Sequence, residues 1–135
     1  MKKIFHFMVV DDDPTNNMIC EFTIKRYNKN AEIKLFTKPE VALSSIKETY
    51  TGNKENQDTV LFLDLNMPTM SGWEFLDEFN LLDPAVKDQF TIYILSSSIE
   101  DFQEEAKLYP DLNGFLSKPL KLDYIEEVMN DLQNN

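Results

Sequence analysis

The sequence has little cysteine and no long apolar run. Its single cysteine, Cys20, excludes an intramolecular disulfide, and we expect a small buried side chain in a reducing compartment. No apolar stretch approaches the roughly 20 residues that a membrane span requires. The opening "MKKIFHFMVV" is no signal peptide, because its apolar run is short and meets "DDD" without a small-residue cleavage site. We therefore expect one soluble, cytoplasmic domain.

Positive charge is also scarce. Thirteen lysines and arginines stand against 24 aspartates and glutamates, which gives a formal net charge of −11 at pH 7. Phosphate backbones select basic patches, so this balance argues against a nucleic-acid partner. It suits cations and basic proteins, and most of these carboxylates are expected to be ordinary solvated surface groups. A local cluster of acids is therefore the feature that requires an explanation.

Short apolar runs alternate with helical patterns along the chain. Five runs are typical of buried strands, at residues 4–10, 32–36, 59–64, 91–96 and 114–117. Five helical patterns follow them in turn, at residues 15–27, 38–50, 71–82, 98–109 and 120–132. Strict alternation of strand and helix predicts an α/β fold, with a doubly wound five-stranded parallel sheet covered on both faces in three α/β/α layers.

The helical patterns also predict caps and buried faces. Asp13 can cap the first helix and Pro14 suits its first position, while Ser71 is the expected cap of the third helix. In the first helix the expected apolar face consists of Met18, Ile19, Phe22 and Thr23. The corresponding side of the third helix consists of Phe75, Leu76, Phe79 and Leu82. The stripe of the last helix consists of Leu122, Ile125, Val128, Met129 and Leu132.

Polar residues stand at the carboxyl ends of four expected strands, and these residues are Asp11–Asp13, Asp64, Ser96–Ser98 and Lys118. In an open parallel sheet these strand ends share one edge, where ligands bind. Carboxylates gathered at one place repel one another and raise each other's pKa unless a cation compensates. Carboxylates, a backbone carbonyl and waters suit Mg²⁺, which tends to bind alongside phosphate oxygens.

A cation, an ammonium group and a hydroxyl around one carboxylate form an apparatus for phosphoryl transfer, which relies mostly on electrostatic stabilisation. Asp64 would be the nucleophile, because aspartate can form a covalent acyl phosphate. Lys118 would contribute a positive charge, and a serine hydroxyl would contribute a hydrogen-bond donor.

Four motifs make the sequence similar to a known family: "MVVDDDP", "LFLDLNMPTMSG", "IYILSSS" and "GFLSKPL". In this order and spacing the chain resembles, over essentially its whole length, the receiver domain of response regulators in two-component signalling, of the single-domain chemotaxis type. The resemblance implies the flavodoxin-like strand order 2-1-3-4-5. It also implies that residues 1–135 form one receiver domain with no output domain.

The resemblance assigns a role to each site residue. Asp64 matches the phosphoacceptor, Asp12 the direct Mg²⁺ ligand, and Asp11 the acid that holds the ion through water. Asn66 would contribute its backbone carbonyl to the same ion.

Further matches concern the response to phosphorylation. Ser96 matches the hydroxyl residue that bonds the phosphoryl group, and Lys118 matches the lysine that pairs with it. Phe115 matches the aromatic residue that switches position when the hydroxyl residue moves. The family pattern also implies a cis bond between Lys118 and Pro119.

The implied function is a phosphorylation-dependent switch rather than an enzyme. A histidine kinase or a histidine phosphotransfer protein would donate the phosphoryl group to Asp64 with Mg²⁺, in a phosphorelay that ends on an unknown effector. Asn66 and Ser98 flank the expected path of the hydrolytic water and carry no carboxylate, so we expect slow autodephosphorylation.

Two alternatives stand beside this hypothesis. A phosphatase of the haloacid dehalogenase type also has an aspartate nucleophile after an apolar strand, but it requires a second aspartate two residues later, where this chain has Asn66. A degenerate receiver would act by binding alone, although all five reactive positions are present.

Overall fold

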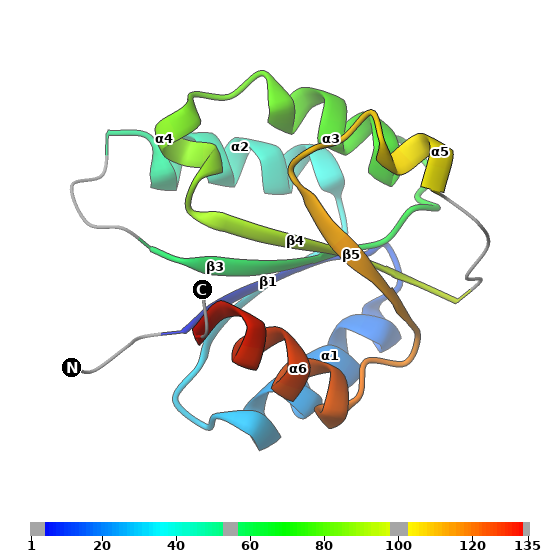
Figure 1. The fold of residues 1–135 in the computed structure, drawn as a ribbon. Coiled ribbons are helices and arrows are strands. Elements are labelled where there is room, and N and C mark those ends of the chain that lie inside the picture. Colours follow the sequence, from blue (N-terminus) through cyan, green and yellow to red (C-terminus); the bar gives the residue numbers. More distant parts are fainter. Residues whose placement is uncertain (1–4, 53–56, 98–102, 134–135) are drawn as a thin grey trace.

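The structure is a computed structural model that describes residues 5–52, 57–97 and 103–133 (Figure 1). Its described part forms a parallel sheet with the order β2-β1-β3-β4-β5, so the expected strand order is confirmed. The strands are β1 (His6–Val10), β2 (Glu32–Phe36), β3 (Thr59–Leu63), β4 (Phe90–Ser96) and β5 (Leu112–Ser117). Their positions agree with the apolar runs to within two residues at each end.

Helices cover both faces of this sheet (Figure 1). One layer contains α1 (Pro14–Tyr27) and α6 (Leu122–Gln133). The other contains α2 (Pro39–Tyr50), α3 (Gly72–Asn80) and the short helices α4 (Pro84–Lys87) and α5 (Gln103–Ala106). The predicted three-layer α/β/α architecture is therefore confirmed. No helix of the described residues has the length and apolar character needed to cross a membrane.

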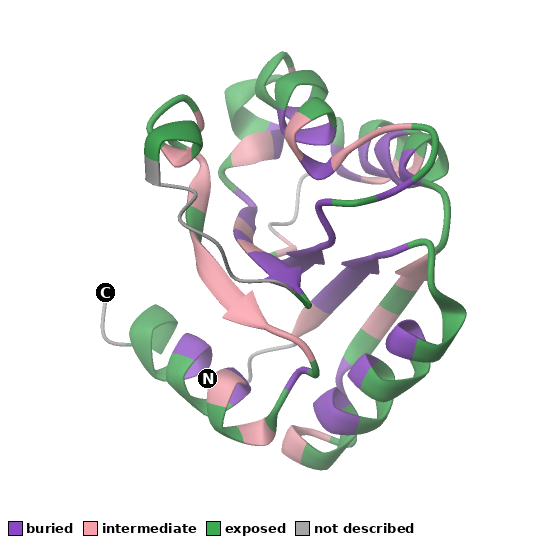
Figure 2. Cartoon of the chain, turned by 90° about the vertical axis from the view of Figure 1, so that its right-hand side faces the viewer, coloured by how far each residue is buried: buried purple, intermediate pink, exposed green. Residues whose placement is uncertain are grey.

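The sheet separates two hydrophobic cores. Met8 and Val10 of β1 contribute to the core beneath α2 and α3, whereas Phe7 and Val9 contribute to the core beneath α1 and α6. Successive side chains of a strand point to opposite faces, so an unbroken apolar run serves both cores at once. Figure 2 shows this burial in the central strands, while the outer strands β2 and β5 are mostly half-buried or exposed.

Strand register brings the carboxyl ends to one edge. Val10 pairs with Phe36 of β2 and with Leu63 of β3, and Leu63 pairs with Ile94 of β4. Ser96 in turn pairs with Ser117 at the end of β5. The residues that follow these positions must therefore emerge at the same edge of the sheet.

Side-chain caps fix the start of two helices. Asp13 accepts a hydrogen bond of 3.0 Å from the backbone N–H of Thr15, and Pro14 occupies the first turn of α1. Ser71 and Glu74 form a reciprocal capping box at the start of α3. Each bond satisfies a backbone donor that the first helical turn leaves without an intrahelical partner, so both predicted caps are confirmed.

The predicted buried face of α1 is wrong for Met18, Ile19 and Phe22, and it is confirmed for Thr23. Met18 and Phe22 are 68% and 67% exposed, and Ile19 is also exposed. The helix instead buries Asn16, Asn17, Cys20, Thr23 and Ile24. These polar side chains tolerate burial because each donates hydrogen bonds, to Asp11, to backbone carbonyls or to a sulfur atom. Apolar periodicity alone could not reveal that choice of face.

Smaller differences concern the other helices. The short helix α4 lies in a segment where no helix was expected. A helix was predicted over residues 98–109. Within the described part of that range only Gln103–Ala106 is helical, and residues 98–102 are not among the described residues. Leu132, predicted in the apolar stripe of α6, is exposed near the end of the chain.

The reassigned face of α1 can be tested by truncation. Ile24 is fully buried, so Ile24→Ala should lower the free energy of unfolding by about 2–5 kcal/mol. Phe22→Ala removes a larger but exposed side chain and should change stability by less than about 0.5 kcal/mol. Urea denaturation of both variants provides the comparison. An equal loss of unfolding free energy in Ile24→Ala and Phe22→Ala would support the face predicted from the apolar pattern.

Candidate functional site

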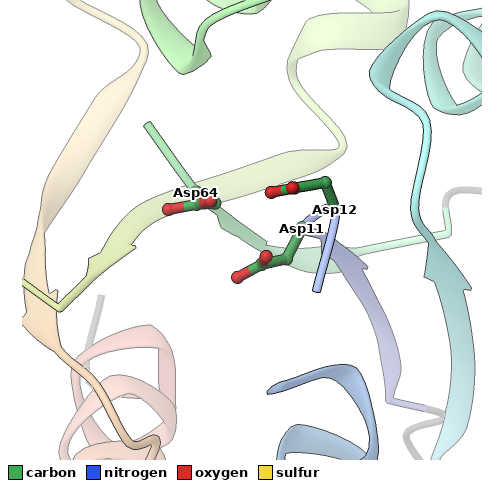
Figure 3. Close-up of side chains that lie close together, drawn as sticks. All are labelled: Asp11, Asp12 and Asp64. Carbon is green, nitrogen blue, oxygen red and sulfur yellow. The ribbon is translucent and has the colours of Figure 1, made fainter. Parts of the chain in front are cut away.

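Three carboxylates converge at the carboxyl edge of the sheet (Figure 3). Asp11 and Asp12 follow β1, Asp64 follows the neighbouring strand β3, and each offers an oxygen within 4.8 Å of the others. Asp11 and Asp64 are 2% and 6% exposed, whereas Asp12 is exposed to solvent. The predicted acidic cluster is therefore present, with two of its members buried.

Lys118 reaches into this cluster from the end of β5. Its Nζ lies 2.6 Å from Asp11 Oδ2 and 3.5 Å from Asp64 Oδ1. The backbone N–H of Lys118 donates to the carbonyl of Ser96, which fixes the chain as it leaves the strand. The bond to Pro119 is cis, as the family pattern implied.

Burial and charge shift the acid–base behaviour of both partners. Burial raises the pKa of Asp64 and the charge of Asp11 raises it further, while Lys118 and the backbone N–H of Asn66 partly offset the change. Burial lowers the pKa of Lys118, but its hydrogen bonds and charge interactions with Asp11 and Asp64 outweigh that effect, and the net pKa is raised. Lys118 is therefore a stable cation at neutral pH.

The cluster fits a hard divalent cation. When ionised, its three carboxylates carry three negative charges, of which one ammonium group compensates one. Carboxylate oxygens are the ligands that Mg²⁺ prefers, and their spacing allows one ion to contact several of them. Asp11, Asp12 and Asp64 are therefore suitable metal ligands in this structure.

The remaining predicted residues lie on the two strands beyond β3. Ser96 is buried at the end of β4, on the same edge as the cluster. Phe115 pairs with Ile94 one strand further out and packs partly buried against the core beneath α2 and α3. Its ring meets the ring of Trp73 edge-on, with centroids 6.4 Å apart. Phe115 therefore faces an aromatic neighbour on α3.

A close approach of the backbone shapes the loop after β3. The N–H of Gly72 donates to the carbonyl of Leu65, which folds the loop back onto the end of the strand. A Cβ atom at Gly72 would lie 2.6 Å from the backbone oxygen of Asp64, well inside van der Waals contact. Glycine is therefore required for the loop that presents Asp64 and Asn66.

Sequence reasoning missed the support beneath Asp11. Asn16 is buried, and its Nδ2 donates a hydrogen bond of 2.9 Å to Asp11 Oδ2. The same amide donates to Cys20 Sγ at 3.7 Å. Burial and the charge of Asp11 raise the pKa of Cys20 to about 12. The sequence did contain a signal for this support. Asn16 and Asn17 stand in the first turn of the helix that follows the acidic end of β1.

Comparison with known proteins decides the family. Residues 7–130 match the sequence profile of the response regulator receiver domain. The chain belongs to that family. This receiver domain is thus a component of two-component signalling, and the family implies a cognate histidine kinase. The phosphatase alternative is set aside, because the match is to a signalling phosphoacceptor rather than to an enzyme of the dehalogenase type.

Solved structures agree with this assignment. The receiver domain is 26% identical to a two-component response regulator from Cytophaga hutchinsonii, with a TM-score of 0.85 and coverage of 99% of this chain and 100% of that chain. A receiver protein from Dyadobacter fermentans is 23% identical, with a TM-score of 0.82 and coverage of 94% and 96%.

The chemotaxis protein CheY4 of Vibrio cholerae is 19% identical, with a TM-score of 0.75 and coverage of 96% and 98%. The last two likenesses concern the fold alone. No curated protein sequence matches the chain.

The raised pKa of Asp64 predicts a pH-dependent cost to stability. Above that pKa the folded protein holds a buried charge that the unfolded chain solvates better. Asp64→Asn should therefore raise the free energy of unfolding at pH 7 by more than the roughly 0.5 kcal/mol scatter of neutral surface changes. The gain should shrink as the pH falls through the raised pKa toward 3.8, the ordinary value, because the buried carboxyl of the folded wild type becomes protonated.

Urea denaturation at several pH values, without divalent cations, measures this effect. Asp131→Asn on the exposed surface of α6 serves as the control and should change little at any pH. A gain for Asp64→Asn that stayed constant with pH would show that the buried charge is not its cause.

Proposed function

We propose that this receiver domain is a phosphorylation-dependent switch in which Asp64 accepts a phosphoryl group from a histidine kinase or a histidine phosphotransfer protein. The observation that carries this proposal is the buried Asp64 carboxylate, with the Lys118 ammonium at 3.5 Å and two further carboxylates beside it. A nucleophile, a fixed cation and a set of metal ligands at one point suit phosphoryl transfer, which depends mostly on positioning and charge.

The transfer step uses one carboxylate oxygen of Asp64. This oxygen attacks the phosphorus of a phosphohistidine, and a new P–O bond forms as the P–N bond breaks. The electron pair of that bond leaves on the imidazole ring. Mg²⁺, when bound, would offset the negative charge of the phosphoryl oxygens. Asp11, Asp12 and Asp64, with the backbone carbonyl of Asn66, would hold that ion.

Lys118 and Ser96 would report the change to the rest of the domain. In the described state Lys118 is paired with Asp11 and Asp64, and a phosphoryl group on Asp64 would give its ammonium a stronger acceptor. The Ser96 hydroxyl would donate to the same phosphoryl group. Because Lys118 directly follows β5 and bonds the carbonyl of Ser96, its movement would pull on both strand ends.

Phe115 would complete the switch on the outer strand. A shift of Ser96 and Lys118 would change the packing of this ring, which rests against Trp73. The surface formed by α5, β5 and α6 would then bind an effector with a different affinity. Exposed Glu104 and Lys107 of that surface form an ion pair of 3.0 Å that a partner can contact.

Intact mass spectrometry tests the acceptor directly. Wild-type protein incubated with acetyl phosphate should gain one base-labile phosphoryl group, and the gain should require Mg²⁺. Asp64→Asn should gain none, because its amide is not a nucleophile for this reaction. Lys118→Ala should still gain some phosphoryl group, although it lacks the cation that couples Asp64 to β5.

The controls separate the proposal from its alternatives. Equal uptake by Asp64→Asn and the wild type would place the nucleophile elsewhere. If the wild type takes up no phosphoryl group from acetyl phosphate or from a phosphorylated kinase domain, the result would favour a receiver that acts by binding alone. A half-life of the phosphoryl group of only seconds would overturn the expected slow autodephosphorylation.

The single tryptophan offers a readout of the switch. Trp73 stacks on Tyr109 with centroids 5.1 Å apart and contacts Phe115 edge-on, so movement of Phe115 should change its fluorescence. Phosphorylation of the wild type should shift the emission, whereas Asp64→Asn should show no shift under the same conditions. Phe115→Leu should reduce the response, and Phe22→Leu, on the exposed face of α1, should leave it intact. An unchanged response in Phe115→Leu would contradict the proposed coupling.

A further inference from the structure

The carboxylate of Asp11 is held by three donors. Its Oδ1 accepts the backbone N–H of Asp13 at 2.9 Å. Its Oδ2 accepts both Lys118 Nζ at 2.6 Å and Asn16 Nδ2 at 2.9 Å. These contacts occupy most of the lone pairs of the carboxylate and fix its orientation at the end of β1.

Asn16 is built for this contact. Its side chain is only 5% exposed, and both protons of its amide nitrogen have an acceptor, since Nδ2 also lies 3.7 Å from Cys20 Sγ. A flipped amide would place its oxygen against the Asp11 carboxylate, where two acceptors would repel each other. The hydrogen bonds therefore determine which way the amide points, and its donor faces Asp11.

The two donors on Oδ2 differ in what phosphorylation would do to them. Lys118 is shared with Asp64, so a phosphoryl group on Asp64 would draw its ammonium away from Asp11. Asn16 belongs to α1, and the hydrogen bonds that its side chain makes within the described part of the chain go to Asp11 and Cys20. Once Lys118 has moved, Asn16 is the side-chain donor that still holds Oδ2.

We infer that Asn16 is a positioning residue that keeps the Asp11 carboxylate oriented for a divalent cation. This role presupposes the proposed Mg²⁺-dependent phosphorylation of Asp64. Side chains that hydrogen-bond a metal ligand from behind fix its orientation, and their loss typically weakens metal affinity by about 10- to 100-fold. Without Asn16, Oδ2 of Asp11 would lose one of its two donors and would be oriented by Lys118, which competes with the ion for that oxygen.

The neighbouring Asn17 provides a matched control. It is 3% exposed and lies in the same turn of α1, so its burial is similar to that of Asn16. Its Nδ2 donates to the backbone carbonyls of Asp11 and Phe36, at 3.1 Å and 3.3 Å, and not to the carboxylate. Asn17 therefore ties the ends of β1 and β2 together without orienting a metal ligand.

The experiment compares Asn16→Leu with Asn17→Leu in the full chain. Each variant replaces a buried amide by an apolar side chain of similar size, so both should lose stability in urea denaturation. Calorimetric titration with Mg²⁺ alone should show an affinity at least about tenfold weaker for Asn16→Leu and within about twofold of the wild type for Asn17→Leu. If Asn16→Leu does not fold, Asn16→Ala takes its place.

Phosphorylation by acetyl phosphate supplies a second readout. For Asn16→Leu the Mg²⁺ concentration that gives half the maximal rate should rise by the same factor, while the rate at saturating Mg²⁺ returns close to that of the wild type. A normal Mg²⁺ affinity in Asn16→Leu, or an equal loss in Asn17→Leu, would overturn the positioning role. Failure of the proposed function is a distinct result, because the wild type itself would then take up no phosphoryl group.

Discussion

The contact between Lys118 and the two buried carboxylates of Asp11 and Asp64 is the interaction on which the site depends. Removal of charges from water costs several kcal/mol per ion unless partners compensate, and the ammonium offsets part of that cost for both acids at the sheet edge. The same contact joins β5, which is the outer strand next to β4 in the described sheet, to the ends of the central strands β1 and β3. Charge balance and the position of the outer strand are thereby linked.

That linkage reaches both layers of helices. Along β5, Phe115 packs toward the core beneath α3, and Leu116 packs toward the core beneath α1 and α6. A displacement of the strand end at Lys118 therefore disturbs the two cores together, although the sheet separates them. An outer strand with one paired edge is the least costly place in the sheet for such movement, because fewer hydrogen bonds resist it.

The sequence predicted the sheet and the acidic edge well because both follow from short-range patterns. Strands buried on two faces appear as unbroken apolar runs, and parallel strands must end at one edge, so the amino-acid order alone places Asp11, Asp64 and Lys118 together. Apolar periodicity could not predict the face of α1, since burial of Asn16 and Asn17 depends on hydrogen-bond acceptors of Asp11 and Phe36 at the ends of β1 and β2. The single turn of α4 carries too few residues for a period to be detected.

The burial of Cys20 has a consequence for the chemical resistance of the domain. Thiolates, not thiols, react with oxidants and electrophiles, and burial together with the charge of Asp11 keeps this sulfur protonated far above neutral pH. Asp11, a suitable ligand for a cation, thus also helps to keep the thiol of Cys20 in its unreactive protonated form. Cys20 should therefore resist oxidants and electrophiles for as long as the fold persists.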